Sequence, residues 1–150
     1  MSLLPKMQIL DYATSELKCD WMDVLLCAAA RFKIGTSSGP ATVSHAFEIP
    51  IAMANYLPTA TLYLSKLDLF IPKLLRCRTN GSMVSFSKQM SLPLSTCASD
   101  GMFKNVFEVE VIPNTSQEIL ELVEEMVCKL ERRHSKSAED DILKTKTLRL

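Results

Sequence analysis

The clearest pattern in the chain is a strand, a turn, a helix and a second strand between residues 31 and 56. Residues 31–34 (RFKI) alternate between polar and apolar, which is typical of a half-buried strand. Pro40 fits the first turn of a helix, which we expect to end before Pro50. The apolar run IAMANY at 51–56 predicts a second, buried strand. Two strands joined through a helix form a βαβ unit, so the pattern predicts a parallel sheet.

Another strand and a long helix are predicted near the C-terminus. Residues 106–112 (VFEVEVI) alternate as a strand does. Thr115 and Glu118 have the spacing of a capping box at the start of a helix. Apolar residues then recur at a period near 3.6, so we expect one face of this helix to be buried. These residues are Ile119, Val123, Met126, Val127 and Leu130.

The N-terminal region predicts a helix that packs on the sheet. Residues 8–13 are a short apolar run that is either a strand or the lead-in to one. Thr14 or Ser15 is expected to cap a helix over 16–30, whose early acidic residues suit the positive end of the helix dipole. The apolar face that we expect to be buried consists of Leu17, Trp21, Val24, Leu25 and Ala28.

Residues 56–105 have a weaker pattern, because prolines and the turn signal at 80–81 interrupt them. Residues 68–75 (DLFIPKLL) are either a strand or an ordered loop. Residues 83–91 are either a weakly alternating strand or a short helix, and residues 91–104 have the pattern of a loop. We find no internal repeat.

Composition and charge indicate one ordinary globular domain. We expect an α/β domain over residues 1–134 and a polar tail over 135–150, which is either a frayed end or a short helix that packs elsewhere. Seventeen acidic and seventeen basic residues balance, which argues against a general nucleic-acid binder.

The five cysteines are odd in number and form no CxxC pair, so we expect free, mostly buried thiols in a reducing cytoplasm. The sequence has neither a convincing signal peptide nor an apolar run long enough to cross a bilayer. We therefore expect a cytoplasmic protein whose membrane contact is at most peripheral.

The turn GTSSGP at 35–40 is the candidate binding motif. It follows the carboxyl end of a predicted parallel strand, where ligands of such sheets bind. Gly35 and Gly39 permit tight curvature and close approach by a ligand. The amides that begin the next helix suit a phosphate or diphosphate. Three hydroxyl residues complete this cradle: Thr36, Ser37 and Ser38. The alternative is a structural turn with capping hydroxyls, and the motif is neither a Walker loop nor GxGxxG.

Other candidate residues admit two interpretations. Asn55 follows the second strand and either contacts a ligand or shapes the turn. Lys73 either offsets phosphate charge or is solvated. His45 is better explained as structural, because it would face away from the cradle unless its helix is short. For the remaining candidates, a position at a helix cap, at a helix end or on the solvated surface is a better explanation than a role in binding or catalysis. These residues are His134, Asp20, Asp23, Glu124, Glu125, Arg76 and Arg78.

Several of these segments together resemble a known enzyme family. The turn with Ser38, Gly39-Pro40 and the strand that begins near Pro50 is similar to the diphosphate-binding loop of GT-B glycosyltransferases, such as lipopolysaccharide heptosyltransferases. The chain also resembles, over about residues 9–131, a family of bacterial glycosyltransferases associated with surface-polysaccharide genes. The matching segments are 20–32, 35–40, 55–58, 71–73 and 111–126.

The resemblance implies a three-layer, Rossmann-like half of a GT-B fold with a short parallel sheet. It implies that residues 35–39, Asn55 and Lys73 contact a nucleotide-diphosphate sugar as the donor, with no metal and no further cofactor. GT-B enzymes have a second, acceptor-binding domain that usually supplies the catalytic base. This chain has no counterpart to that domain, so no catalytic residue is assigned and the expected partner is that domain or a second copy. The alternative is a non-catalytic module that binds a nucleotide or protein, or dimerises.

Overall fold

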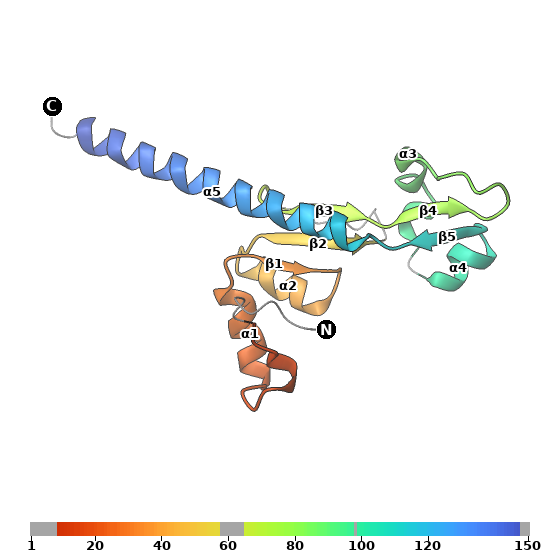
Figure 1. The fold of residues 1–150 in the computed structure, drawn as a ribbon, viewed down its shortest axis with the longest axis horizontal. Coiled ribbons are helices and arrows are strands. Elements are labelled where there is room, and N and C mark those ends of the chain that lie inside the picture. The colour runs from red at the N-terminus through yellow and green to blue at the C-terminus, as the bar shows by residue number, and fades with distance from the viewer. Residues whose placement is uncertain (1–8, 58–64, 98, 148–150) are drawn as a thin grey trace.

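The computed structural model describes residues 9–57, 65–97 and 99–147. These form a mixed α/β fold with a parallel sheet of three strands and a separate antiparallel pair (Figure 1). The elements are η1 Tyr12–Thr14, α1 Asp20–Ala29, β1 Lys33–Gly35, α2 Gly39–Ala46, β2 Ile51–Tyr56, β3 Leu69–Pro72, β4 Leu74–Cys77, α3 Phe86–Gln89, η3 Leu94–Thr96, α4 Asp100–Asn105, β5 Val109–Ile112 and α5 Ser116–Thr147.

The parallel sheet contains the predicted βαβ unit. Its strand order is β1-β2-β3, and both pairs are parallel. Lys33 pairs with Ile51 at one end of the β1–β2 ladder, and Gly35 pairs with Met53 at the other. The three arrows in Figure 1 therefore point the same way, and their carboxyl ends share one edge of the sheet.

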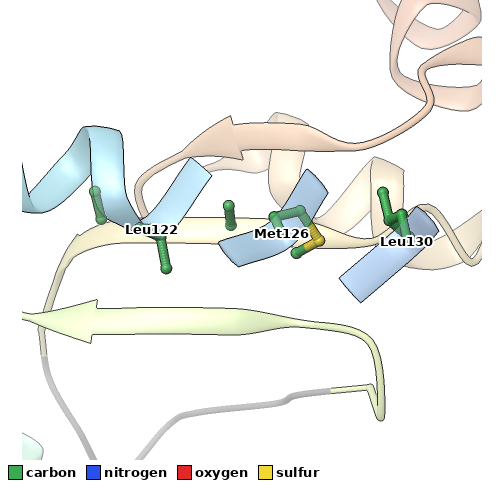
Figure 2. Packing of buried hydrophobic residues seen from close by; sticks show 5 residues of the cluster. Leu122, Met126 and Leu130 are labelled. Atoms are coloured by element: carbon green, nitrogen blue, oxygen red, sulfur yellow. The ribbon is translucent and has the colours of Figure 1, made fainter. Parts of the chain in front are cut away.

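The central strand β2 is buried on both faces, which explains its continuous apolar sequence. Successive side chains of a strand point to opposite faces. Ile51 and Met53 pack in a cluster with Ala41 of α2. Ala52 and Ala54 pack in a second cluster with α5, which contributes Leu122, Met126 and Leu130. Figure 2 shows these three α5 side chains spaced along the helix beside the strands. The sheet is thus covered by α2 on one face and by α5 on the other.

The antiparallel pair β4–β5 lies beyond the carboxyl ends of the parallel strands (Figure 1). Its buried cluster contains Leu75, Leu94, Cys97, Phe103 and Val109. The predicted strand at 106–112 is confirmed only from Val109 onward, because Glu108 has a positive φ of 51° that interrupts the extended backbone. Residues 91–104, predicted as a loop, instead contain η3 and α4.

The capping box at the start of α5 is confirmed. The Glu118 carboxylate accepts hydrogen bonds from the Thr115 amide at 2.6 Å and from the Thr115 hydroxyl at 2.8 Å, and the Glu118 amide donates to that hydroxyl at 3.2 Å. These bonds, with the backbone bond foremost, lower the pKa of Glu118 below its ordinary value. The helix then continues without a break to Thr147, so the backbone of the predicted polar tail belongs to α5 as far as that residue.

The prediction for the N-terminal region was wrong in three respects. Residues 9–13 form no strand, and α1 begins at Asp20 with Cys19 as its N-cap residue. No residue of α1 is buried, and Trp21 is 64 % exposed. The helix packs against α2, where the Ser44 hydroxyl donates to the Cys27 carbonyl at 3.4 Å. The physical reason is that α2 and α5 occupy the two faces of β2, and the short edge strand β1 offers little further surface.

Among the residues that the structure describes, no helix is both long and apolar enough to cross a membrane.

The contact between α5 and β2 should dominate stability. Met126 is fully buried between the helix and the sheet. We expect Met126→Ala to lower the free energy of unfolding by about 2–5 kcal/mol, because it removes apolar contacts and leaves a cavity. Denaturant unfolding followed by circular dichroism measures this loss. The control Leu120→Ala, at a position 49 % exposed on the same helix, should change it by less than about 0.5 kcal/mol. Equal losses in the two variants would contradict this assignment of the core.

Candidate functional site

The bend between β1 and α2 lies at the carboxyl end of the parallel sheet and is exposed from Thr36 to Pro40. Ser38 is the N-cap residue of α2 and has extended backbone angles, but its side chain makes no capping hydrogen bond. Its carbonyl accepts a hydrogen bond from the Ala41 amide at 2.9 Å. The bend is therefore held by backbone geometry, without the capping hydroxyl that a purely structural turn would use.

The fold does not require glycine at either end of this bend. Gly81 is the one glycine in the chain with a positive φ, so the tight curvature that we expected of Gly35 and Gly39 is achieved in ordinary backbone conformations. A Cβ atom built on Gly39 would meet nothing within 4 Å. A Cβ atom on Gly35 would make an ordinary contact with the Lys33 side chain at 3.5 Å. The space above Gly39 is thus open to a ligand that approaches the backbone.

A cavity of about 460 Å³ opens beside this bend. Its volume is in the range that small-molecule ligands occupy. The Tyr56 ring on its wall is packed edge-on against Phe70, with ring centroids 6.3 Å apart. The residues that line the cavity are Ser37, Ser38, Ala41, Thr42, His45, Met53 and Tyr56.

Sequence reasoning identified the two serines of this cavity but missed the wall that α2 provides. Ala41 and Thr42 follow Ser38 by three and four residues, and His45 follows them by four and three, so the four residues share one side of the helix. That spacing was the available signal. Because α2 is only eight residues long, His45 in its last turn still reaches the cavity that begins at Ser38.

His45 also lies next to a buried carboxylate. Its Nε2 atom is 3.5 Å from Oδ2 of Asp68, whose side chain is fully buried. Asp68 accepts hydrogen bonds from the Ile51 amide at 2.8 Å and from the Ser65 amide at 2.7 Å. The first bond ties the start of β2 to the segment before β3, and the second closes a turn within that segment, so Asp68 holds the amino-terminal end of the sheet together. Sequence reasoning did not identify Asp68.

Asn55 has a structural role, because it connects β2 to the segment before α5. It lies in β2 where the β2–β3 register shifts, and its φ is 55°, in the left-handed region that asparagine tolerates better than most residues. The Asn114 amide donates to the Asn55 side-chain oxygen at 2.7 Å, and the Asn55 amide donates to the Asn114 side-chain oxygen at 2.6 Å. This reciprocal pair joins the end of β2 to the segment before α5.

Lys73 does not line the cavity beside the bend. It follows β3 at the same edge of the sheet, and its amide donates to the Tyr56 carbonyl at 3.3 Å. Its side chain instead lines a second cavity of about 500 Å³, together with Arg78 and Lys104. The structure therefore places Ser37 and Ser38 at one cavity and Lys73 at another, while Gly35, Thr36 and Gly39 belong to the bend but line neither of these two cavities.

The remaining candidates are mostly exposed. Asp20 and Asp23 lie on the first turn of α1, and Glu124 and Glu125 are exposed on α5. Arg76 forms an exposed ion pair with Glu110. His134 lies in the part of α5 for which the structure describes the backbone and not the side chains. Among the described residues, no three His, Cys, Asp or Glu side chains are placed to hold a metal ion.

The cysteines are all unpaired, but the expectation that most are buried was wrong. Cys97 alone is buried, whereas Cys128 is exposed and the other three are intermediate. Hydrogen bonds, foremost from the Thr79 hydroxyl 2.9 Å from Sγ, lower the pKa of the Cys77 thiol. Cys77 lies at the end of β4 and lines none of the described cavities.

Comparisons of this chain with protein-family models, with curated proteins and with solved structures give no match. Family membership therefore stays a prediction that rests on the motifs of the sequence.

The structural role of Asn55 predicts a stability effect that needs no ligand. Asn55→Ala removes the side-chain oxygen that the Asn114 amide uses and puts alanine at a φ of 55°. We expect it to lower the free energy of unfolding by about 1–3 kcal/mol, measured by denaturant unfolding. Asn55→Gly should lose less, because glycine relieves the backbone strain and leaves only the lost hydrogen bond. A stability of Asn55→Ala equal to that of the original chain would refute the role.

Proposed function

We propose that this chain is the Rossmann-like, nucleotide-diphosphate-sugar-binding domain of a glycosyltransferase of surface-polysaccharide biosynthesis. The observation that carries the proposal is the exposed bend with Ser37, Ser38 and Gly39, which opens into a cavity at the carboxyl end of a parallel sheet. This is where ligands of such sheets bind. The resemblance of the motifs at 35–40 and 111–126 to bacterial GT-B enzymes supports the same assignment.

The proposed chemistry at this bend is stabilisation of the leaving group. In glycosyl transfer, the nucleoside diphosphate departs and negative charge develops on its phosphate oxygens. The start of α2 carries a partial positive charge, and the open space above Gly39 lets a diphosphate approach the backbone. Hydrogen-bond donors that are already in place at this bend stabilise the developing charge without reorganisation.

The proposal also assigns a partner and a location. An acceptor-binding domain is needed to complete the reaction, and α1 is a surface that suits such a partner. Leu17, Trp21 and Leu25 leave apolar surface exposed on and before this helix. The unpaired cysteines are consistent with the proposed location in the reducing cytoplasm.

Nucleotide-sugar binding should raise the melting temperature of the chain, because a ligand of the native state stabilises it. We expect a rise with one of the UDP-, GDP- or ADP-sugars at concentrations well above its dissociation constant. Gly39→Val should abolish the rise, because its side chain fills the space above the bend while the fold has room for it. Gly101→Ala is the matched control, since its Cβ also meets only an ordinary contact, with Ser99 at 3.6 Å. A rise of equal size in Gly39→Val would contradict the proposed site.

A second candidate function is a non-catalytic module that acts as a homodimer. Two observations favour it: α1 exposes apolar surface, and in the edge strand β1 Ile34 is 49 % exposed. Such surfaces favour association.

Homodimerisation predicts a sedimentation coefficient that rises with protein concentration in analytical ultracentrifugation. Trp21→Ser should shift the chain toward monomer, because it removes the largest exposed apolar side chain of α1. Lys18→Ser, at an exposed polar position before the same helix, is the control and should leave the association unchanged. A chain that stays monomeric at every concentration, with a nucleotide-sugar melting shift, would exclude this second function.

A further inference from the structure

The second cavity, which lies between α4 and the β4–β5 pair, has an unusual concentration of positive charge. Three cationic side chains line it: Lys73 after β3, Arg78 after β4 and Lys104 in the last turn of α4. Glu110 is the one carboxylate on its wall, and Arg76 already holds it through Nε at 3.0 Å and Nη2 at 2.7 Å. The cavity therefore keeps a net positive charge in a chain whose formal net charge is zero.

This charge belongs to the cavity and is not a general property of the surface. A neighbouring cavity of about 420 Å³, where α5 meets β3, is lined by carboxylates: Asp68, Glu118, Glu121 and Glu125. The two cavities thus have opposite electrostatic character. A small anion is attracted to the first and repelled by the second.

The wall of the cationic cavity is partly apolar. Phe103 of α4 and Val109 of β5 are buried in the cluster beneath it, and Val111 is half buried beside them. Figure 1 shows β5 between β4 and α4, so strand and helix together form this wall. The combination suits a ligand that has an anionic group on an apolar body. The volume of about 500 Å³ accommodates a small molecule of this kind.

We propose that this cavity binds an organic phosphate that is distinct from the nucleotide sugar. Lys73, Arg78 and Lys104 receive the phosphate group, and the Phe103–Val109 wall contacts the apolar part. The phosphate belongs either to a soluble metabolite or to a lipid, which share this chemistry. The site depends on α4 and β5 and not on the bend at 36–39, so it stands whether or not the chain binds a nucleotide sugar.

The test uses the whole chain and phenyl phosphate as the probe, with inorganic phosphate and phenol for comparison. Titrations followed by two-dimensional amide NMR should shift the signals of Phe103, Lys104 and Val109. We expect phenyl phosphate to bind more tightly than inorganic phosphate, and phenol to leave these signals unchanged. Binding should weaken as salt is raised, because the cations that receive the phosphate are partly exposed.

Matched variants connect the binding to the three cations. Arg78→Ala and Lys104→Ala should each raise the dissociation constant of phenyl phosphate by about two- to fivefold, and the double variant by about tenfold. Lys88→Ala is the control, because Lys88 lies in the last turn of the short helix α3 as Lys104 lies in the last turn of α4, yet it does not line the cavity. Gly39→Val should leave this binding unchanged, which separates it from the proposed nucleotide-sugar site.

Two results would overturn the proposal: signals that move only around residues 36–42, or a dissociation constant that is the same in the double variant. Vesicles that contain phosphatidic acid identify the source of the phosphate. If the vesicles bind the original chain but not the double variant, and soluble phenyl phosphate binds weakly, the ligand is a lipid. If phenyl phosphate binds and the vesicles do not, the ligand is a soluble phosphate.

Discussion

The whole arrangement depends on a strand that has to be covered on both sides. Ile51 and Met53 face one helix, while Ala52 and Ala54 face another, so β2 is stable only between two layers. The alanines let α5 approach closely, with Met126 filling the space between them. This sandwich fixes the direction of α2 and thereby places the start of that helix at the carboxyl ends of the strands. The open bend follows from burial elsewhere in the fold.

The cavity beside the bend and the cationic cavity both lie on the outside of this sandwich. The bend of 36–39 is short, exposed and free of a structural need for glycine, whereas the cationic cavity rests on a separate small core around Leu75 and Phe103. Tyr56 connects the two regions, because its ring lines the first cavity and its carbonyl accepts the amide of Lys73. The fold thus holds two separate cavities that are connected through the backbone of Tyr56 and Lys73.

The parts that local pattern predicted well are those in which local and tertiary preferences agree. A few neighbouring residues determine the local structure of the run at 51–56, the turn at 35–40 and the capping box at Thr115. The exposure of α1 could not be predicted, because an apolar stripe shows only that a helix is able to pack and not that the rest of the chain provides a surface for it. The spacing of residues along α2 did indicate the cavity wall that includes His45, but the cationic cavity depends on contacts between segments far apart in sequence. No local pattern contains that information.

The exposure of Trp21 has a consequence for how this molecule can be observed. It is the single tryptophan of the chain, and its indole is already hydrated in the folded state. Its emission should therefore change little when the β2 sandwich comes apart, and the wavelength of that emission is a poor measure of folding. The same residue becomes a sensitive reporter of association, since any protein that covers α1 takes the indole out of water and moves its fluorescence to shorter wavelength.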